Sequence, residues 1–394
     1  MGREKSFSNS SSPSGPFVRH PEAFTFCHPK AFSFCCHSEG AERPKNLTQN
    51  NPSDPSLSLR VTIKNLKLDN VDKNLLNIIQ AEFPLSREPF AALGLRLSVN
   101  WNEVIQRIER LKSGGIIRLI GPVFNPRRLG YRTTLVAVKV SVERLDKAER
   151  IVSTHPMVSH CYERDHDFNL WFTLAMPVAE DIESEVHKLG SRIKAEEILN
   201  LPAIRTFKIG AYFNLGGYTT SVPDMVTHHN KLSDTDFELS PADRAIINEL
   251  QQDLPLSEKP FDLISARLSI DVDKFLSHCQ ALLQRGIMRR FSASINHSKL
   301  GFTANAMACW NTPPDIIEAA GKKIAKFPEI SHCYERQTSP LWPYNLFAMI
   351  HAATKETCRA IADRICSETR LGKNDLVLLF STKEIRKTRV RYTV

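Results

Sequence analysis

The hexapeptide Ser159-His160-Cys161-Tyr162-Glu163-Arg164 occurs a second time in this chain, as Ser331-His332-Cys333-Tyr334-Glu335-Arg336. Each copy is followed by an aromatic-Asn-Leu segment, at residues 168–170 and 344–346. If both copies are strands, the alternation of side chains places the histidine, tyrosine and arginine of each copy on one face. A face with imidazole, phenol and guanidinium groups is too polar for a core. We therefore predict that these faces bind an anionic, partly flat ligand.

The duplication extends well beyond the hexapeptide. Leu68 matches Leu239, and Gly115 matches Gly286, each pair being 171 residues apart, whereas the hexapeptides are 172 apart. The second copy has gained a few residues just after its hexapeptide, at 337–343. Two similar modules in one chain predict a pair related by a pseudo-twofold axis, like a symmetric dimer joined into one polypeptide.

Composition indicates an ordinary soluble protein with room for two or more domains. The chain has 394 residues, of which 42% are hydrophobic and 24% are charged. No apolar segment approaches the roughly 20 residues that cross a bilayer, so we expect no membrane association. The net charge of +9 permits nucleic acid, acidic membranes or a polycarboxylate as partner. Nine cysteines without a CxxC pair indicate reduced thiols and a cytoplasmic location.

Residues 1–60 differ from the rest of the chain. They are rich in Ser, Pro, Phe and His, and no helical or strand period is sustained. We predict a disordered tail, or a mis-assigned start followed by the true one near Val61, and no secretory signal. Metal binding by the histidines and cysteines of the tail is an alternative, although their spacing fits no closed site. A linker is predicted at residues 216–237.

The first part of each module is predicted to be a winged helix-turn-helix, at residues 61–130 and 238–300. Apolar residues recur at helical spacing in the first segment, from Leu75 to Phe83. Two further helices are predicted at 90–97 and 102–112, the last ending at Gly114 and Gly115. Strands at 116–120 and 131–133, joined by a Pro- and Arg-rich loop, are predicted to form the wing.

The second part of each module, at residues 131–215 and 301–394, alternates strands and helices. In module 1 we predict strands at 134–142, 159–164, 168–174 and 203–213, with helices at 143–154 and 180–199. The order βαββαβ predicts a ferredoxin-like sandwich with helices on one face of the sheet. We expect the modules to pair through the helix-free faces, on which the repeated His/Tyr/Arg sets lie. The predicted fold class is therefore α+β, in two tandem modules that form a pseudo-dimer.

This plan resembles that of the Lrp/AsnC transcription regulators, so DNA binding is one hypothesis. A recognition helix presents basic or amide side chains to base edges at its first turn. Here the corresponding turns carry Glu103 in module 1 and Asp271 and Asp273 in module 2. Carboxylates at that place repel phosphates. We therefore expect no binding to DNA.

A second resemblance is more specific. Residues 164–173, Arg-Asp-His-Asp-Phe-Asn-Leu-Trp-Phe-Thr, resemble one subunit type of the siroheme decarboxylases, and residues 342–351, Trp-Pro-Tyr-Asn-Leu-Phe-Ala-Met-Ile-His, resemble the other. The segment Leu-Lys-Ser-Gly-Gly-Ile-Ile-Arg at 111–118 fits as well. The likeness covers about residues 66–394, and the tail has no counterpart. The chain therefore resembles a natural fusion of the two subunits.

The resemblance implies a carboxy-lyase that converts two acetate groups of siroheme to methyls, giving 12,18-didecarboxysiroheme and carbon dioxide. It implies no added cofactor, because the iron belongs to the substrate, whose ring can accept the electron pair. The pathway would be that of heme or d-type heme. We expect a histidine with a pKa near neutrality to supply the proton, and any site histidine is a candidate axial ligand of the substrate iron. A heme-binding protein without catalysis is a further alternative.

The candidate residues fall into two groups. Those predicted to be catalytic are His351, Arg336, His332, His166, Arg164 and His160. Those predicted to bind the substrate are Tyr162, Trp171, Tyr334, Trp342, Asn169, Asn345, Arg118 and Arg289. Arginines suit carboxylates because they bind them with two hydrogen bonds, and aromatic rings suit a flat macrocycle. His166 and His351 each occur in one module only, which favours a single working site. The basic run from Lys383 to Arg391 is predicted to be a solvated closing strand, with gating of the pocket as the alternative.

Overall fold

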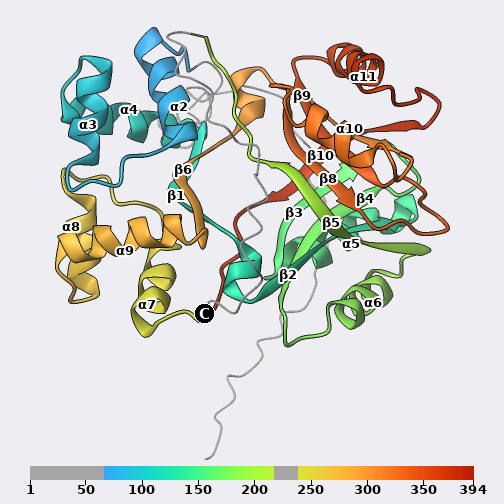
Figure 1. Ribbon diagram of the computed structural model, residues 1–394, viewed down its shortest axis with the longest axis horizontal. Coiled ribbons are helices and arrows are strands. Elements are labelled where there is room, and N and C mark those ends of the chain that lie inside the picture. The colour runs from blue at the N-terminus through green and yellow to red at the C-terminus, as the bar shows by residue number, and fades with distance from the viewer. Residues whose placement is uncertain (1–65, 217–237) are drawn as a thin grey trace, which may run out of the picture. The chain divides into compact units, whose positions relative to one another are not determined.

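The computed structural model describes residues 66–216 and 238–394. The predicted tail and, apart from Gly216, the predicted linker lie outside these residues. Within the described ranges, no helix is both long and apolar enough to span a membrane. Figure 1 shows the elements in chain order. The predicted fold class is confirmed, with two modules that each contain a helix-turn-helix and a ferredoxin-like domain.

The two helix-turn-helix parts share one hydrophobic core. In module 1 they comprise α2 (Asn70–Ala81), α3 (Pro89–Leu97), α4 (Trp101–Ser113) and β1 (Ile117–Phe124). In module 2 they comprise α7 (Pro241–Leu250), α8 (Pro260–Arg267), α9 (Val272–Gln284) and β6 (Met288–Ile295). Capping boxes begin α2 at Asp69 and α7 at Ser240. Both third helices lead into a glycine with φ of 67°, Gly115 and Gly286, a conformation that disfavours other residues.

The predicted wing takes a different form. Strand β1 does not pair with the segment that begins at Tyr131. It pairs antiparallel with β6 of the other module, in a two-stranded ribbon. Two backbone hydrogen bonds join further segments to the ribbon, from Phe83 N to Phe291 O and from Leu254 N to Ile120 O. The backbone groups of β1 find their hydrogen-bond partners in β6, the equivalent strand of the second module. The ribbon therefore links the two modules.

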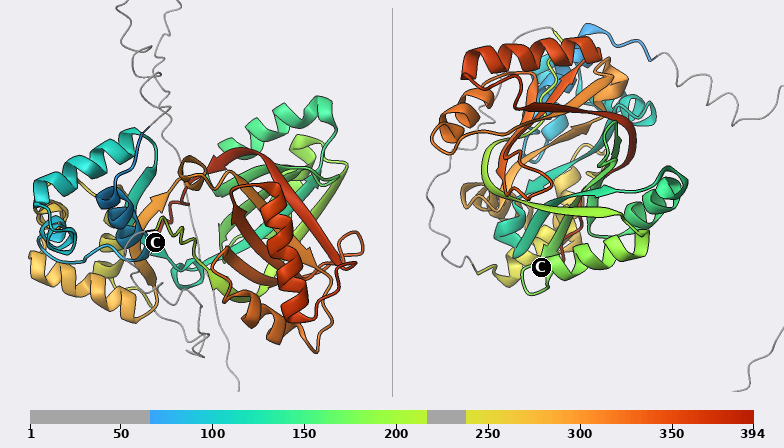
Figure 2. Two further views of the ribbon diagram at one scale, coloured as in Figure 1. Left: turned by 90° about the horizontal axis from the view of Figure 1, so that it is seen from above. Right: turned by 90° about the vertical axis from the view of Figure 1, so that its right-hand side faces the viewer.

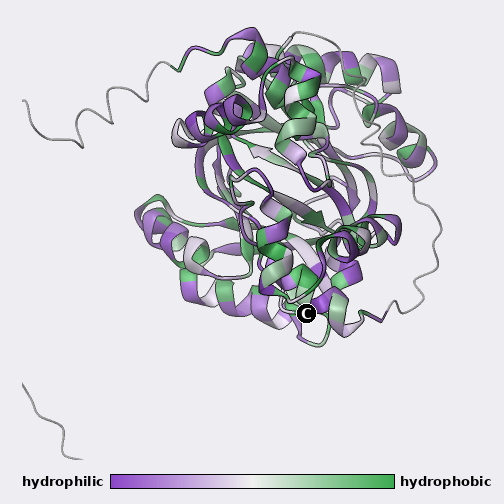
Figure 3. Cartoon of the chain, turned by 90° about the vertical axis from the view of Figure 1, so that its left-hand side faces the viewer, coloured by the Kyte–Doolittle hydropathy of each residue, from purple (hydrophilic) through white to green (hydrophobic). Residues whose placement is uncertain are grey.

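Each ferredoxin-like domain has the predicted order. Module 1 contains β2 (Tyr131–Lys139), α5 (Val142–Thr154), β3 (Val158–Arg164), β4 (Leu170–Pro177), α6 (Ile182–Ile193) and β5 (Glu197–Ile209). Module 2 contains β7 (Ala304–Trp310), α10 (Ile317–Ile324), β8 (Ile330–Arg336), β9 (Leu346–Ala352), α11 (Lys355–Thr369) and β10 (Leu376–Lys387). Short 3₁₀ turns, η2 (Pro126–Leu129) and η3 (His297–Leu300), precede β2 and β7. The helices pack against the outer sides of the strands, as Figure 2 shows. In Figure 3 the helices nearest the viewer carry both hydrophilic and hydrophobic residues.

The last strand of each domain belongs to both modules. Strand β5 pairs with β2 through residues 197–202 and with β8 through residues 203–209. Likewise, β10 pairs with β7 through residues 376–380 and with β3 through residues 381–387. The two sheets thus close into one eight-stranded barrel. The pseudo-dimer is confirmed, but its sheets join along their edges, and their helix-free faces line the interior together.

The length of β5 explains why the sequence did not reveal this junction. We expected a helix over 180–199 and a strand over 203–213. Helix α6 ends earlier, because Lys194 has a φ of 56° and caps it in the left-handed conformation. Strand β5 therefore begins at Glu197 and has 13 residues, enough to serve two sheets.

One contact across the modules can be tested directly. Phe207 of β5 is buried in the core of module 2, where it lies against Gly321 of α10. A Cβ atom at Gly321 would overlap the Phe207 ring. We expect Gly321→Ala to lower the free energy of unfolding by about 1–2 kcal/mol, because overpacking outweighs the better helix propensity of alanine. Urea unfolding would measure this. In the double variant with Phe207→Leu the two losses should be less than additive.

Candidate active site

A cavity of about 720 Å³ lies along the interior faces of the barrel strands. Strand β1, η2 and the residues that follow β10 bound its other side. Its volume is in the range of pockets that hold large organic ligands. The cavity contains residues of both modules, so it exists only because the modules are paired.

The cavity wall is strongly cationic. Seven basic residues line it: Arg127, Arg164, Arg289, Arg336, Lys387, Arg389 and Arg391. One carboxylate lies among the lining residues, that of Asp253, and it pairs with Lys112. Such an excess of positive charge attracts a ligand with several negative groups.

Both repeated His/Tyr/Arg sets face this cavity. All six side chains, from β3 and β8, are among its lining residues. Within each set the histidine stacks on the tyrosine, with ring centroids 6.5 Å apart in module 1 and 6.1 Å apart in module 2. The arginine lies over the same tyrosine ring, at 5.6 Å and 4.7 Å respectively. The two strands thus present equivalent polar faces across the pseudo-twofold axis.

The arginines of the two hexapeptides have no counter-ion among the described residues, and Arg164 is buried whereas Arg336 is half-buried. Nη1 of Arg164 donates to Leu379 O at 2.8 Å, and Nη1 of Arg336 donates to Leu201 O at 2.8 Å. Within the described ranges neither forms an ion pair, and Nε of each lacks a hydrogen-bond partner. Burial lowers the pKa of both to about 10, so both stay charged at neutral pH. Buried unpaired charges are costly, and an anionic ligand would relieve that cost.

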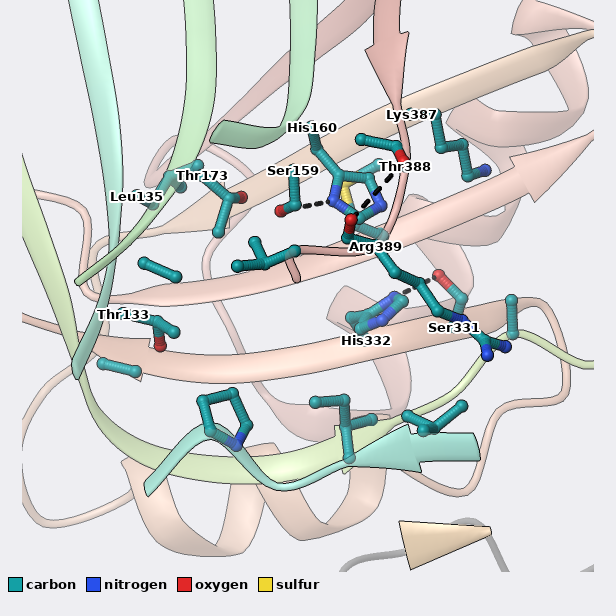
Figure 4. Close-up of a pocket in the computed structure, with 18 of the residues that line it drawn as sticks. Thr133, Leu135, Ser159, His160, Thr173, Ser331, His332, Lys387, Thr388 and Arg389 are labelled. Atoms are coloured by element: carbon teal, nitrogen blue, oxygen red, sulfur yellow. Dashed lines mark hydrogen bonds between the residues drawn. The ribbon is translucent and has the colours of Figure 1, made fainter. Parts of the chain in front are cut away.

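Serine hydroxyls hold the histidines, as Figure 4 shows. Ser159 Oγ lies 2.9 Å from His160 Nδ1, and Ser331 Oγ lies 2.9 Å from His332 Nδ1. In module 2 the same hydroxyl also contacts His351 Nε2 at 2.8 Å. A hydrogen-bonded chain His332–Ser331–His351 results. It is confined to module 2, because the position equivalent to His351 in β4 is Ala175.

His297 was not predicted from the sequence. Its ring centroid lies 4.8 Å from that of His351, and its Nδ1 lies 3.3 Å from Lys387 Nζ. In the described part of the chain, His297 Nε2 and His351 Nδ1 are buried without a hydrogen-bond partner. The duplication gave no signal here, because Pro126 occupies the equivalent position in module 1. The two modules therefore differ at both of these histidines.

We expected a histidine with a pKa near neutrality in the site, and the structure corrects this. Burial lowers the pKa of His160 to about 4 and that of His332 to about 3. Burial, followed by the nearby His297, holds the pKa of His351 well below its ordinary value. Nearby cations such as Lys387 act in the same direction. These imidazoles are therefore neutral at pH 7, and a carboxylate placed beside them would raise their pKa.

Most predicted site residues lie at the cavity. Those that line it are His160, Tyr162, Arg164, Trp171, Arg289, His332, Tyr334, Arg336 and His351. Trp171 is almost fully buried, and its indole nitrogen donates to Phe168 O. Arg289 donates to the amide oxygen of Asn125, and burial lowers the pKa of Arg289.

Five predicted site residues are not among the lining residues. Trp342 is in the core, 5.2 Å from the Trp171 ring, and His166 lies against Trp342 with ring centroids 5.5 Å apart. Arg118 bonds Glu384 behind the cavity wall. The structure thus gives Trp342 and His166 packing contacts instead of places at the cavity.

The two asparagines have a structural role that the sequence pattern did not reveal. Asn169 exchanges two hydrogen bonds with the backbone of Val140, and Asn345 does the same with Thr312. Each pair ties the start of one strand to the loop after another. Because both groups of the amide are engaged with backbone, these asparagines are not positioned to bind substrate.

The predicted closing strand ends at Lys387, earlier than expected, and the segment that follows it borders the cavity. Residues 387–392 are all among the lining residues. The side-chain amide of Gln251 donates to Tyr392 O and accepts from Tyr392 N. The Tyr131 hydroxyl likewise donates to Thr393 O and accepts from Thr393 N. In module 1, Gln80 holds Phe213 in the same way. These hydrogen bonds hold residues 392 and 393 beside the cavity.

Two protein families match the chain, and each of them matches one segment in module 1 and one in module 2. The AsnC-like ligand binding domain matches residues 128–208 and 299–386. The siroheme decarboxylase NirDL-like HTH domain matches residues 72–118 and 243–289. The matched ranges coincide with the barrel halves and the helix-turn-helix parts described above.

Individual relatives agree with these matches. The siroheme decarboxylase of Hydrogenobacter thermophilus is 38% identical over 321 residues, which are 81% of this chain and 93% of that protein. The siroheme decarboxylase beta subunit of Methanosarcina barkeri is 42% identical over 149 residues, which are 38% of this chain and 97% of that protein. The crystal structure of the siroheme decarboxylase NirDL in complex with an iron-uroporphyrin III analogue is 35% identical, with a TM-score of 0.60, and the match covers 83% of this chain and 95% of that one.

Proposed function

The chain belongs to the siroheme decarboxylase family, and we propose that it converts two acetate side chains of siroheme to methyl groups in the barrel cavity. The product is 12,18-didecarboxysiroheme, and two molecules of carbon dioxide are released. The observation that carries this proposal is that Arg164 and Arg336 line the cavity beside the two hexapeptide tyrosines and form no ion pair within the described part of the chain. A flat substrate with several carboxylates complements such a wall in both shape and charge.

Binding would use the arginines and the tyrosine rings. Arg336 and Arg164 offer guanidinium groups to carboxylates from opposite halves of the cavity. Tyr334 and Tyr162 offer ring faces on which the macrocycle can lie. Because these groups are held by backbone carbonyls and by stacking, little side-chain freedom is lost when the substrate binds.

The reaction at each acetate breaks the bond between the CH₂ carbon and the carboxylate. The electron pair of that bond passes into the substrate ring, carbon dioxide leaves, and the CH₂ carbon takes up one proton to become a methyl group. The ring serves as the electron sink, so the proposal requires no added cofactor. The protein's own task is to hold the carboxylate and to deliver the proton.

The chain His332–Ser331–His351 is suited to proton delivery. Both imidazoles are neutral at pH 7, and substrate carboxylates beside them would favour the charged form. A proton taken up by one histidine can pass through the Ser331 hydroxyl to the other, because both contacts are shorter than 3 Å. The described residues of module 1 form no such chain, so we assign the working site to module 2.

The test of the proposed activity is anaerobic incubation of the protein with siroheme in a buffer without added cofactors. Mass spectrometry of the tetrapyrrole should show the loss of two molecules of carbon dioxide. Recovery of unchanged siroheme in a tight complex would instead support a heme-binding protein without catalysis.

Replacing the central serine tests the assignment to module 2. We expect Ser331→Ala to lower kcat by about tenfold, because one hydrogen bond of the proton chain is lost while binding groups remain. Ser159→Ala is the matched control, since it removes the same contact from the half without a His351 equivalent. Single-turnover kinetics would measure both. A larger loss for Ser159→Ala would move the working site to module 1.

Lys387 predicts a dependence of binding on pH. Burial lowers the pKa of Lys387 to about 8, although Glu384 acts in the opposite direction. The side chain is charged below that pH and neutral above it. We expect affinity for siroheme to fall about tenfold as pH rises through this pKa, because one charged hydrogen bond is lost. Absorbance titrations would measure this, and Lys387→Met should flatten the profile. An unchanged slope in that variant would contradict the prediction.

We do not propose DNA as a partner. Glu103 at the start of α4 pairs with Arg107, and Asp271 caps α9, so both helix starts carry carboxylates. These groups oppose phosphate contacts. Absence of DNA-fragment binding in gel shifts at moderate salt would agree with this view, and sequence-specific shifts would contradict it.

We propose a cytoplasmic location, which the six free cysteines of the described residues support.

A further inference from the structure

The side chains of His297 and Lys387 continue the contacts of the His332–Ser331–His351 chain. The ring centroids of His297 and His351 are 4.8 Å apart, and His297 Nδ1 lies 3.3 Å from Lys387 Nζ. Lys387 is half-buried and lines the cavity at the end of β10 (Figure 4). These five side chains, from Lys387 to His332, form an extended chain that starts and ends at the cavity wall.

Two nitrogens at the centre of the extended chain are buried and unpartnered. Neither His297 Nε2 nor His351 Nδ1 has a hydrogen-bond partner among the described residues. Buried polar groups in this state are rare in folded proteins. The ring separation of 4.8 Å allows a hydrogen bond between these two nitrogens once the imidazoles turn toward each other. That bond would join Lys387 to the rest of the chain without a break.

The donors and acceptors of the extended chain can all run in one direction. An ammonium only donates, so His297 Nδ1 accepts from Lys387, and the neutral His297 ring carries its hydrogen on Nε2. His351, if it accepts this hydrogen at Nδ1, donates from Nε2 to the Ser331 hydroxyl, which in turn donates to His332 Nδ1. The hydrogen of His332 is then on Nε2, in a ring that lines the cavity. This is the order of donors that carries a proton from Lys387 to the substrate.

The equivalent series of the other half is apolar at three of its five positions. Strand β5 places Ile209 opposite the hexapeptide histidine of module 2, as β10 places Lys387 opposite that of module 1. In the same order as the extended chain, the members of this second series are Ile209, Pro126, Ala175, Ser159 and His160. Only the serine and the histidine have the side chains of their counterparts. The side chains that can store or pass a proton are thus complete in one half of the cavity only.

Lys387 is the member of the extended chain that carries a spare proton at neutral pH. Burial lowers its pKa to about 8, and burial lowers the pKa of His297 to about 4. A neutral imidazole must take up a proton before it can give one up at this pH, and the other cations of the cavity wall are arginines, which do not release theirs. The ionisable groups that face Lys387 are Glu384 on its own strand, Arg118 of β1, His160 of β3, His297 of η3, His332 of β8 and His351 of β9.

We propose that Lys387 and His297 extend the chain into a proton relay, in which the Lys387 ammonium is the acid and His297 passes its proton to His351. The Nζ–H bond of Lys387 breaks, its electron pair stays on the neutral amine, and the proton moves along the relay to His332. His332 gives it to the carbon that has lost carbon dioxide, where the electron pair held by the ring forms the new C–H bond. Each siroheme consumes two protons, so Lys387 regains one from water at the cavity between the two steps. This inference rests on the proposed function and names the source of the protons that it requires.

The experiment compares Lys387→Arg with the unaltered protein at saturating siroheme under anaerobic single-turnover conditions. Arginine keeps the positive charge at the cavity wall but does not release its proton near neutral pH. We expect the rate constant of decarboxylation to fall about 10²-fold or more, while the Kd for iron-uroporphyrin III at pH 7 stays within about threefold.

The pH profile of the same rate constant is a second readout. In the unaltered protein it should fall as pH rises through about 8, because Lys387 is the active acid only while it is protonated. This decline should be missing from Lys387→Arg. An unchanged rate constant and an unchanged profile in folded Lys387→Arg overturn the inference.

Two variants of His297 separate a relay from a positioning role. His297→Asn keeps an acceptor for the Lys387 ammonium but cannot pass a proton on, and His297→Leu offers neither function. We expect the rate constant to fall about tenfold or more in both. Because His297 is buried, thermal unfolding must show that both variants are folded. Full activity in His297→Asn would show that His297 only positions Lys387, and would overturn the relay.

Lys383→Arg is the matched control. Lys383 lies on the same strand, pairs with Glu149 and is not among the cavity-lining residues. Its rate constant and pH profile should equal those of the unaltered protein. If the unaltered protein does not decarboxylate siroheme, the proposed function fails and the relay fails with it. If it does, and Lys387→Arg behaves identically, the relay alone fails.

Discussion

Replacing His351 with alanine is expected to lower kcat for siroheme decarboxylation by about 10²- to 10⁴-fold, the usual effect of losing a positioned proton donor. His351 ends the hydrogen-bonded chain through Ser331, and its ring packs against His297 and Phe213. Because it is not itself a carboxylate clamp, the KM for siroheme should change little. Rapid-quench kinetics with mass detection would separate the two parameters.

The control for this variant is His166→Ala. His166 is also a histidine unique to one module, but it packs against Phe168 and Trp342 and is not among the residues that line the cavity. We expect its kcat to stay near that of the unaltered protein. Full activity in folded His351→Ala would remove His351 from the mechanism. A greater loss in His160→Ala would transfer the working site to module 1 without removing it from the cavity.

Replacing Arg336 with alanine is expected to raise the Kd for siroheme about 10- to 100-fold, with a smaller effect on kcat. The variant loses a charged hydrogen bond to a carboxylate, worth about 1.5–3 kcal/mol. It also leaves the Tyr334 ring without the guanidinium that lies 4.7 Å from its centroid. Equilibrium binding followed by absorbance would measure the change, with iron-uroporphyrin III as a ligand that is independent of turnover.

Two companion variants sharpen this experiment. Arg336→Lys keeps the charge but loses the planar pair of donors, so its Kd should lie between those of the alanine variant and the unaltered protein. Arg164→Ala removes the equivalent group from the half to which we do not assign the working site, and we expect a smaller rise in Kd. Because Arg336 also donates to Leu201 O across the modules, thermal unfolding must show that Arg336→Ala remains folded. Equal Kd values for both alanine variants would contradict the preference for the module 2 half.

Much of the fold followed from repetition and period. The repeated hexapeptide established two modules, and strand alternation correctly placed His160, Tyr162 and Arg164 on one face, because a strand has an invariant period of two. The second and third helices of module 1 were predicted within one residue of their bounds, whereas its first helix begins at Asn70, five residues before the predicted stretch. Caps such as Asn100 and the left-handed Gly115 are local signals, and a single sequence carries them in full.

The asparagines and tryptophans show where pattern alone is insufficient. Asn169 and Asn345 follow the hexapeptides as closely as any site residue would, yet both bind backbone carbonyl and amide groups of loops. Trp171 borders the cavity and Trp342 does not, although their rings are in contact. Position near a motif cannot tell a group that faces a cavity from one that supports its wall.

The sequence by itself determined the duplication, the order of elements in each module and the chemical character of the ligand, because these depend on local spacing and side-chain type. Only the tertiary structure decided how the modules join, since β5 and β10 find half of their hydrogen-bond partners in the other module. It also brought His297 to His351 and Glu384 to Tyr162, pairs that are distant along the chain. Strand pairing and burial set these contacts, and both depend on the whole chain being folded.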